Sequence, residues 1–263
     1  MTRLTPTFKE KVWGSTSLEP LFPNSDKKIG EVWFEGVDDL PVLIKFLFTT
    51  EKLSVQVHPD DTYARKHHNS RGKTEMWHVL RAEPGARIAA GFRETLTPQR
   101  AREAALSGEI EDLLNWFEVT PGETFFIPAG TVHAIGAGLT LCEIQQHSDI
   151  TYRLYDYGRP RELHLDQALE VSDLGPYDAR QQKKGEVLVS CPYFTTSRLC
   201  ISNSAKHILR LNNHPCTSEL IVVVDGSGTL GGYPIKAGEV WYLEAEIQDI
   251  ELSGTADILH ITP

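Results

Sequence analysis

Short strand-like runs separated by turn residues are the feature that most constrains how this chain can fold. They include IGEVWFEG, LPVLIKFLFT, KLSVQVH, EMWHVLRA, ARIAAGF, ETFFIPAG, LTLCEIQQ and TYRLYDYG, and Gly, Pro, Asp or Asn residues bound them. Several short strands with frequent turn signals are typical of a β-sandwich or a small β-barrel. The sequence therefore predicts an all-β fold with only minor helices.

One stretch between residues 95 and 117 departs from this pattern. Thr97 followed by Pro98 is an N-cap and first-turn signal, and helix-forming residues continue to about Leu106. The segment SGEIEDLLNW, from Ser107 to Trp116, fits a second short helix. Its inner face is predicted to carry Ile110, Leu113 and Leu114. We expect a small helical insertion here.

A polar segment divides the chain into two parts. SDLGPYDARQQKKG, near residues 173–184, contains Gly and Pro and has no hydrophobic period, and strand-like runs resume after it. We predict two β-domains, residues 1–178 and 179–263. PGETFFIPAGTVHAIG in the first part and KAGEVWYLEAE in the second share a Gly-led turn before a strand. This echo suggests two copies of one barrel unit, of which only the first keeps a polar centre.

Composition and charge limit the classes of binding partner and the cellular compartment that we expect for this protein. The 263 residues carry a formal net charge of -10 without a basic block, which argues against nucleic acid or an anionic membrane as the main partner. No apolar run approaches the roughly 20 residues of a membrane span, and the first residues lack an apolar signal core. We expect a cytoplasmic protein with reduced thiols, because its cysteines show no CxxC spacing. They are Cys142, Cys191, Cys200 and Cys216.

The run SVQVHPDD places polar side chains where a barrel strand would face inward. Gln56 and His58 alternate with Val55 and Val57, so the amide and the imidazole share one face of the strand. Inward polar groups are costly unless they are satisfied. A bound metal ion would satisfy them.

A second motif supplies a further histidine. The pattern Gly-x5-Pro-x-Gly-x2-His from Gly122 to His133 resembles a motif of the cupin barrel, in which the histidine points into the barrel mouth. A buried structural histidine is the alternative reading. Taken with Glu75 from GKTEMWHVL, the two motifs offer an amide, two imidazoles and a carboxylate to a divalent metal such as zinc. These ligands are Gln56, His58, Glu75 and His133.

The other histidines receive structural or solvated roles. His67 and His68 lie in a polar run, and His78 is three residues from Glu75 and should face the other way. His147 is close to the site in sequence, and its exclusion is the least secure. Structural roles are assigned to His164, His207 and His214.

Five separated segments together resemble the type I mannose-6-phosphate isomerases, with the short bacterial class most similar. They are LPVLIKFLFTTEKLSVQVHPDDTYA, GKTEMWHVL, FFIPAGTVHAIGAG, EIQQHSDITYRLYDYGR and RELHLDQAL. The resemblance runs from about Trp13 to Val171, with a fainter tail to the end. It implies a double cupin of two jelly-roll barrels and a small phosphosugar substrate. One departure is that the long helical domain of the larger enzymes is reduced here to residues 95–117.

The resemblance also implies site roles. One zinc ion per chain would be held by Gln56, His58, Glu75 and His133, and Lys73 would be an active-site lysine beside an Asp149/Arg153 pair. The implied reaction interconverts mannose 6-phosphate and fructose 6-phosphate through a metal-stabilised cis-enediol. The second barrel has no ligand set. A monomer or weak homo-oligomer is expected.

Several assignments stay open at this point. The base is Lys73, His58, Glu143 or Asp149, and Glu143 either faces the substrate or lines the barrel as a hydrogen-bond partner. Arg153 holds the enediolate oxygens or the phosphate, and Asp149 could hold Arg153 in place. Further phosphate candidates are Arg159 and the expected loop residues Lys66 and Arg71. Two other functions compete: a cupin dioxygenase, and a sugar-binding cupin without catalysis. The Gln56 ligand and Lys73 favour the isomerase.

Overall fold

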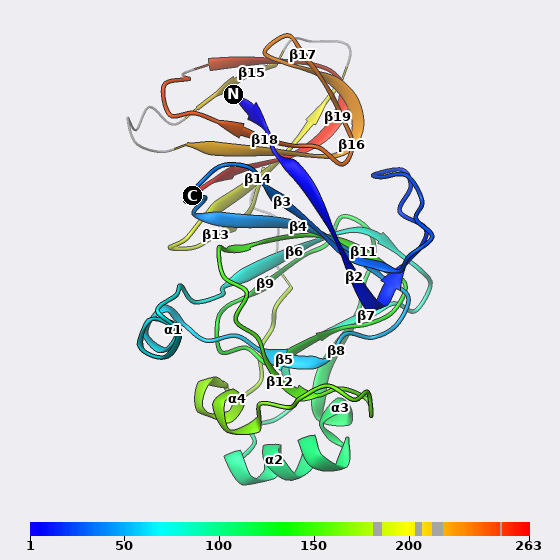
Figure 1. Ribbon diagram of the computed structural model, residues 1–263, viewed down its shortest axis with the longest axis vertical. Helices are drawn as coiled ribbons and strands as arrows, with labels where there is room; N and C mark the ends of the chain where they lie inside the picture. The colour runs from blue at the N-terminus through cyan, green and yellow to red at the C-terminus, as the bar shows by residue number, and fades with distance from the viewer. Residues whose placement is uncertain (181–185, 203–206, 212–217, 248) are drawn as a thin grey trace.

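The computed structural model describes residues 1–180, 186–202, 207–211, 218–247 and 249–263. Figure 1 shows two β-barrel units stacked along the long axis, with helices at the end remote from the second unit. Within the described residues, no helix is long and apolar enough to span a membrane. The predicted all-β fold with minor helices is confirmed.

Two sheets enclose the first barrel. The first contains, in spatial order, β2 (Thr5–Ser15), β3 (Ile29–Glu35), β4 (Val42–Thr49), β11 (Leu139–Gln146), β6 (Glu75–Ala82) and β9 (Thr124–Ile127). The second contains β12 (Tyr152–Tyr155), β5 (Val55–Val57), β10 (His133–Ile135), β7 (Arg87–Phe92) and β8 (Leu114–Glu118). A core that includes Trp77, Val79, Leu141, Ile88 and Ile135 fills the space between the two sheets.

One large sheet forms the second barrel. Its strands are β1 (Thr2–Arg3), β18 (Val240–Leu243), β16 (Glu219–Leu230), β19 (Asp249–Thr262), β14 (Thr195–Ile201) and β13 (Val187–Ser190), with β15 (His207–Arg210) on β19 and β17 (Tyr233–Lys236) on β16. The predicted echo between the two halves has a structural counterpart. Gly122 before β9 and Gly238 before β18 both have a left-handed backbone, with φ of 88° and 87°. Glycine adopts this conformation without a steric penalty.

A shared apolar core joins the barrels. Ile44, Phe46 and Ile144 on the outer face of the first sheet pack in one cluster with Val222 and Ile261 of the second barrel. Consequently every residue of β4 is buried, because one face lines the first barrel and the other faces the second. The two units on either side of the proposed boundary between residues 178 and 179 thus share a core. The position of this boundary stays a prediction.

Four short helices decorate the first barrel. They are α1 (Asp61–His68), α2 (Pro98–Ser107), α3 (Ile110–Leu113) and α4 (Leu165–Val171). The expected start of α2 is confirmed, because the Thr97 side chain accepts a hydrogen bond from Arg100 N. Buried alanines of α2 and α4 pack against Val55 and Val57 of β5.

The second expected helix is too long. Helix α3 ends at Leu113, and Leu114 begins strand β8, which pairs with β7 along Ile88 and Ala89. Pairing with a neighbouring strand outweighs the local helical pattern of this segment. The insertion expected at residues 95–117 is thus part helix and part barrel strand.

The described cysteines Cys142, Cys191 and Cys200 are free thiols, as expected. Cys216, His214 and part of the predicted domain boundary lie outside the described residues. The expectations of a cytoplasmic location and of a monomer or weak homo-oligomer rest on sequence and resemblance, and they stay predictions.

Candidate active site

Strand register brings the predicted ligands together. In β5, Val55 and Val57 face the helices, so Gln56 and the following His58 face the barrel interior. His133, the first residue of β10, lies opposite Gln56 on the neighbouring strand. Glu75 reaches the same interior from the start of β6 in the other sheet. The cluster thus spans the two sheets of the first barrel.

Three of the four expected ligands form a compact group. One ligand atom from each of His58, Glu75 and His133 lies within 4.8 Å of the others, and all three side chains are buried. Each imidazole Nε2 is 3.5 Å from an oxygen of the Glu75 carboxylate. The fourth expected ligand, Gln56, lines the adjoining pocket. Two imidazoles and one carboxylate are a common ligand set for zinc.

Backbone carbonyls fix both imidazoles for ligation. His58 Nδ1 lies 2.9 Å from Ile150 O, and His133 Nδ1 lies 2.9 Å from Thr131 O. A carbonyl only accepts, so each Nδ1 carries the proton and each Nε2 presents a lone pair. His133 Nε2 is buried and has no hydrogen-bond partner in the described residues. Two lone pairs directed at a carboxylate require a cation between them.

The Lys73 ammonium supplies part of that positive charge. Its Nζ lies 2.8 Å from His58 Nε2 and 2.5 Å from Glu75 Oε2, and the side chain is buried. Lys73 also lines the pocket beside the cluster, so it lies between the three ligands and the substrate space.

Burial controls the protonation of the three ligands. Desolvation, reinforced by the charge of Lys73, lowers the pKa of His58 well below its usual value. Desolvation also lowers the pKa of His133 to about 4. Both imidazoles are therefore neutral at pH 7, as ligation requires. Desolvation first and the Glu143 charge second raise the pKa of Glu75 to about 7. A divalent cation would offset this cost of a buried charge, so the residues fit a metal site.

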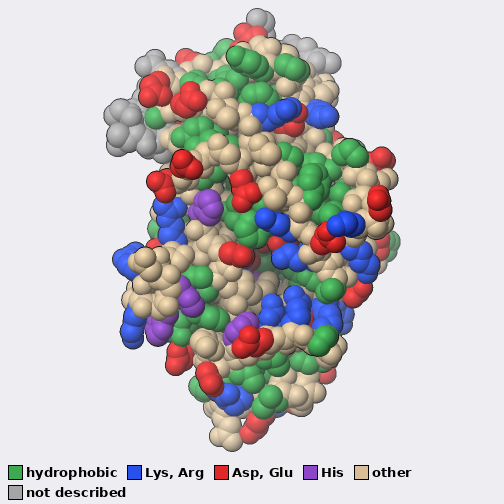
Figure 2. Space-filling view, in the orientation of Figure 1, with side chains coloured by type: hydrophobic (Ala, Val, Ile, Leu, Met, Phe, Trp, Pro, Cys, Tyr) green, Lys and Arg blue, Asp and Glu red, His purple; other side chains and the backbone are tan. Residues whose placement is uncertain are grey.

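A pocket of about 280 Å³ opens beside the cluster. Figure 2 shows Lys and Arg side chains on both sides of a hollow near the middle of the molecule. The charged residues that line the pocket are Lys11, Lys45, Lys73, Arg153, Arg161, Glu31, Glu143 and Asp149. Cations outnumber carboxylates here, although the whole chain has a net charge of -10. The pocket suits an anionic ligand.

Sequence analysis missed Lys45, which lies at the inner wall of this pocket. Lys45 is opposite Glu143 in the β4–β11 ladder, is 3% exposed, and its Nζ is 3.2 Å from Glu143 Oε1. Burial alone lowers the pKa of Lys45, but nearby carboxylates, chiefly Glu143, raise it above its usual value. A lysine at the centre of the apolar run VLIKFLFT was the signal, because lysine is rarely fully buried without a partner.

Glu143 is placed so that both roles considered in the sequence analysis stay open. It lines the pocket and also accepts a 3.0 Å hydrogen bond from Trp77 Nε1. Burial raises the pKa of Glu143, but the charges of Lys45 and Lys73 and the Trp77 bond together lower it below its usual value. Glu143 therefore stays ionised and keeps Lys45 charged.

Asp149 and Arg153 face the same pocket, but no ion pair joins them in the described part of the chain. Arg153 instead donates a 2.8 Å hydrogen bond to Glu162 O, and its buried Nε has no partner among the described residues. Burial, together with the neighbouring Arg161, lowers the pKa of Arg153. The role of the Asp149/Arg153 pair therefore stays a prediction, and it rests on the pocket that both residues line.

The other cations proposed for phosphate lie elsewhere. Lys66 belongs to helix α1 rather than to a loop, and it lines a separate groove next to α4. Arg71 donates to the carbonyls of Leu40 and Pro41. Arg159 is bound to Asp156 and to Lys52 O. The structure brings Arg161, which sequence analysis did not consider, to the pocket in their place.

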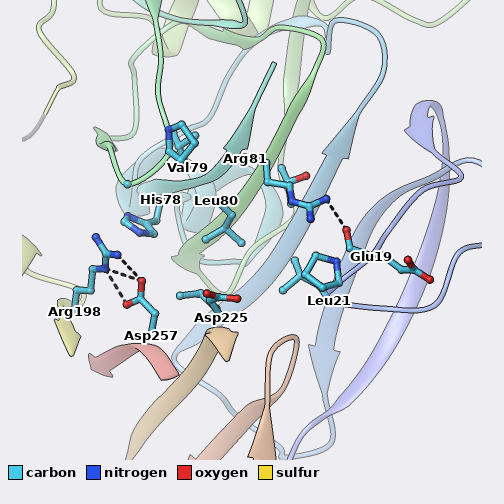
Figure 3. A pocket seen from close by; sticks show the side chains of 14 residues that line it. Glu19, Leu21, His78, Val79, Leu80, Arg81, Arg198, Asp225 and Asp257 are labelled. Carbon is cyan, nitrogen blue, oxygen red and sulfur yellow. Dashed lines mark hydrogen bonds and ion pairs between the residues drawn. The ribbon is translucent and has the colours of Figure 1, made fainter. Parts of the chain in front are cut away.

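The excluded histidines lie apart from the cluster. His78 lines a different cavity of about 390 Å³ between the two barrels, where Figure 3 shows it close to Arg198. His147 Nδ1 contacts Leu40 O. His67 and His68 are exposed on α1, as expected for a solvated run, and they contact Tyr63 and Tyr152 there. Asp60 caps this helix by accepting from Tyr63 N.

Comparison with known proteins identifies the family. No family model matches the chain. Mannose-6-phosphate isomerase ManA of Bacillus subtilis (strain 168) is 32% identical over 309 aligned positions, which cover 97% of this chain and 96% of that protein. The chain belongs to the mannose-6-phosphate isomerase family. Mannose-6-phosphate isomerase of Streptococcus mutans serotype c (strain ATCC 700610 / UA159) is 36% identical, over 83% of this chain and 73% of that protein.

Solved structures of mannose 6-phosphate isomerases share the fold. The crystal structure of the Bacillus subtilis enzyme superposes with a TM-score of 0.86 at 28% identity, and 98% of each chain is covered. A zinc-bound mannose 6-phosphate isomerase superposes with a TM-score of 0.77 at 16% identity, over 99% of this chain and 98% of that one. The predicted double-cupin architecture is confirmed.

Proposed function

We propose that this chain interconverts mannose 6-phosphate and fructose 6-phosphate. The observation that carries the proposal is the buried cluster of His58, Glu75 and His133, which Lys73 connects to a cation-rich pocket. The relatives named mannose-6-phosphate isomerase match nearly the whole chain, which supports the same reaction here.

We propose one zinc ion per chain as the cofactor. His58, Glu75 and His133 would hold it, and Gln56, which lines the adjoining pocket, would complete the set. When bound, the ion would supply Lewis-acid stabilisation of negative charge that develops on the substrate oxygens. The zinc-bound relative supports this identity, although other divalent metals have similar ligand preferences.

The reaction moves a proton between C2 of the aldose and C1 of the ketose, and we consider two side chains as its carriers. His58 has both ring nitrogens engaged, and Glu143 is bound to Lys45 and Trp77. Lys73 and Asp149 remain as pocket-lining candidates. We assign the proton transfer to Lys73, with Asp149 as the alternative, because Lys73 adjoins both the ligand cluster and the pocket.

The buried cations of the pocket stabilise the enediolate. Lys45 stays protonated because Glu143 faces it, so a fixed positive charge lies at the pocket wall. Preorganised charge in a buried site stabilises developing negative charge strongly, because no solvent has to reorient. Glu143 would thus contribute to substrate binding through Lys45.

We propose that the phosphate lies at the arginine end of the pocket. The pocket lysines each have a carboxylate partner: Lys11 with Glu31, Lys45 with Glu143, and Lys73 with Glu75. Arg153 has no carboxylate partner among the described residues, and Arg161 is paired with Asp156, which does not line the pocket. These two guanidinium groups are our candidates, because a guanidinium binds phosphate oxygens with two parallel hydrogen bonds. The sequence contains no glycine-rich phosphate loop of the GxxxxGK[ST] type.

A coupled assay for fructose 6-phosphate formation from mannose 6-phosphate tests the proposal. Activity should disappear with a chelator and return with zinc. A cupin dioxygenase would consume O₂ with iron instead, and a sugar-binding cupin without catalysis would show no turnover. Purified protein with full zinc and no isomerisation would refute the proposed function.

A further inference from the structure

We infer that Asp156 is a positioning residue that holds Arg161 in place to bind the substrate phosphate. This inference rests on the proposed function, because it assigns a role in phosphosugar binding at the same site. Asp156 follows β12 directly and is 2% exposed. The side chain lies behind the arginines of the pocket and does not itself line the pocket.

Both carboxylate oxygens of Asp156 accept from arginines. Oδ2 accepts from Arg161 Nε at 2.5 Å, and Oδ1 accepts from Arg161 NH2 at 2.7 Å and from Arg159 NH2 at 2.8 Å. Arg161 is therefore held along one edge of its planar fork. Its remaining edge is available to a ligand in the pocket that Arg161 lines.

The two arginines have different tasks. Arg159 also donates to Lys52 O at 2.8 Å, and its guanidinium lies 5.5 Å from the centre of the Tyr157 ring. It therefore anchors the carboxylate to the start of the β5 segment. Arg161 is 31% exposed in its side chain and lies outside any strand or helix. Without the carboxylate, this long side chain would sample many rotamers, and ordering it would cost binding free energy.

The charges of this group call for an anion. Three guanidinium groups, Arg153, Arg159 and Arg161, adjoin one buried carboxylate, so two positive charges remain without a buried counterion among these four residues. The acidic Glu162 nearby is exposed, and its carbonyl rather than its carboxylate binds Arg153. A phosphate dianion carries the charge that this end of the pocket lacks.

The test measures binding by calorimetry with zinc-loaded protein and mannitol 6-phosphate, a sugar alcohol phosphate that cannot isomerise. Asp156→Asn should weaken this binding about tenfold or more, because a charge-assisted contact that orders Arg161 is lost. Inorganic phosphate should bind more weakly in the same proportion. Mannitol, which lacks the phosphate, should bind the variant and the wild type alike.

A double-variant comparison distinguishes positioning from general support of the fold. If Asp156 acts through Arg161, the double variant Asp156→Asn/Arg161→Ala should bind no more weakly than Arg161→Ala alone. Arg161→Lys keeps the charge but loses the bidentate contact with Asp156, so it should reproduce most of the loss. This second variant keeps the test decisive if Asp156→Asn unfolds.

Asp257→Asn is the matched control. Asp257 accepts from Arg198 Nε and NH2 in the second barrel, and Figure 3 shows this similar fork beside a cavity without the metal-type cluster. The control should leave mannitol 6-phosphate binding unchanged. Normal binding by Asp156→Asn and Arg161→Lys, fully additive losses, or no binding by wild-type protein would overturn the inference. Binding needs no turnover, so a failure of the isomerase assay alone would refute the proposed function and not this inference.

Discussion

Substitution of Glu143 by Gln tests the idea that a buried ion pair maintains the charge of the pocket. The change keeps the side-chain shape and an acceptor for Trp77 Nε1, but it leaves the Lys45 ammonium, 3% exposed, without its nearest counterion. Breaking a buried pair on one side costs about 3–5 kcal/mol, and the retained Trp77 bond places the expected loss near the lower limit, at about 3 kcal/mol. For a chain of this size, that loss lowers the Tm by roughly 6–12 °C.

The assay is thermal unfolding of zinc-loaded protein, with Lys45→Met and the double variant Lys45→Met/Glu143→Gln measured beside it. The double variant should recover much of the loss, because no unpaired charge is left inside the protein. Asp166→Asn is the matched control: it breaks the Arg102–Asp166 pair, whose side chains are 41% and 81% exposed, and should cost less than about 1 kcal/mol. Equal losses for Glu143→Gln and Asp166→Asn, or additive losses in the double variant, would refute the reasoning.

Four further outcomes concern the metal and the substrate. His133→Ala should lower zinc affinity roughly 100-fold or more, whereas His207→Ala, on the exposed face of β15, should leave it unchanged in equilibrium dialysis. Lys73→Ala should keep the metal but lose on the order of 100- to 1,000-fold in turnover; near-normal turnover would falsify its role. Because the pKa of Glu75 in the metal-free protein is raised to about 7, zinc must displace a proton below that pH. Chelator competition should therefore show affinity falling about tenfold per pH unit below pH 7 and a plateau above it; a flat profile contradicts this. Arg153→Lys should weaken turnover of mannose 6-phosphate far more than turnover of mannose if Arg153 holds the phosphate; equal losses would assign it to the enediolate.

The direction in which Gln56 and His58 face was predictable, because it depends on local alternation along one strand. Gln56 and His58 are two residues apart in a strand that carries valines between them, and this spacing alone determines which face they share. The same rule placed Lys73 beside Glu75. The resemblance of the separated motifs to one family then implied the fold and the three-ligand group. The prediction of both could therefore be made without knowing the strand register.

The features that were missed depend on strand register or on loop conformation. Lys45 acquires its role from Glu143 across a strand pair. Arg161 acquires its role from Asp156, which lies close by in the sequence, but no periodic spacing rule connects two residues of an irregular loop. The local pattern of residues 107–116 predicts a helix. From Leu114 onward, however, the chain is a strand, because it pairs with β7. Neither strand register nor the conformation of an irregular loop can be predicted from the spacing of residues in a single sequence.

The pairing of β1 with β18 has a consequence for biosynthesis. Thr2 and Arg3 pair with Tyr242 and Trp241, so β1 completes a sheet whose partner strand is synthesised much later in translation. Closing so long a loop is slow, because the chain loses conformational entropy before the stabilising contacts form. The first barrel has its own two sheets and can assemble while β1 is still unpaired. During that interval the apolar outer face of β4 lacks its cover, and such exposed surface is prone to aggregate until the second barrel packs against it.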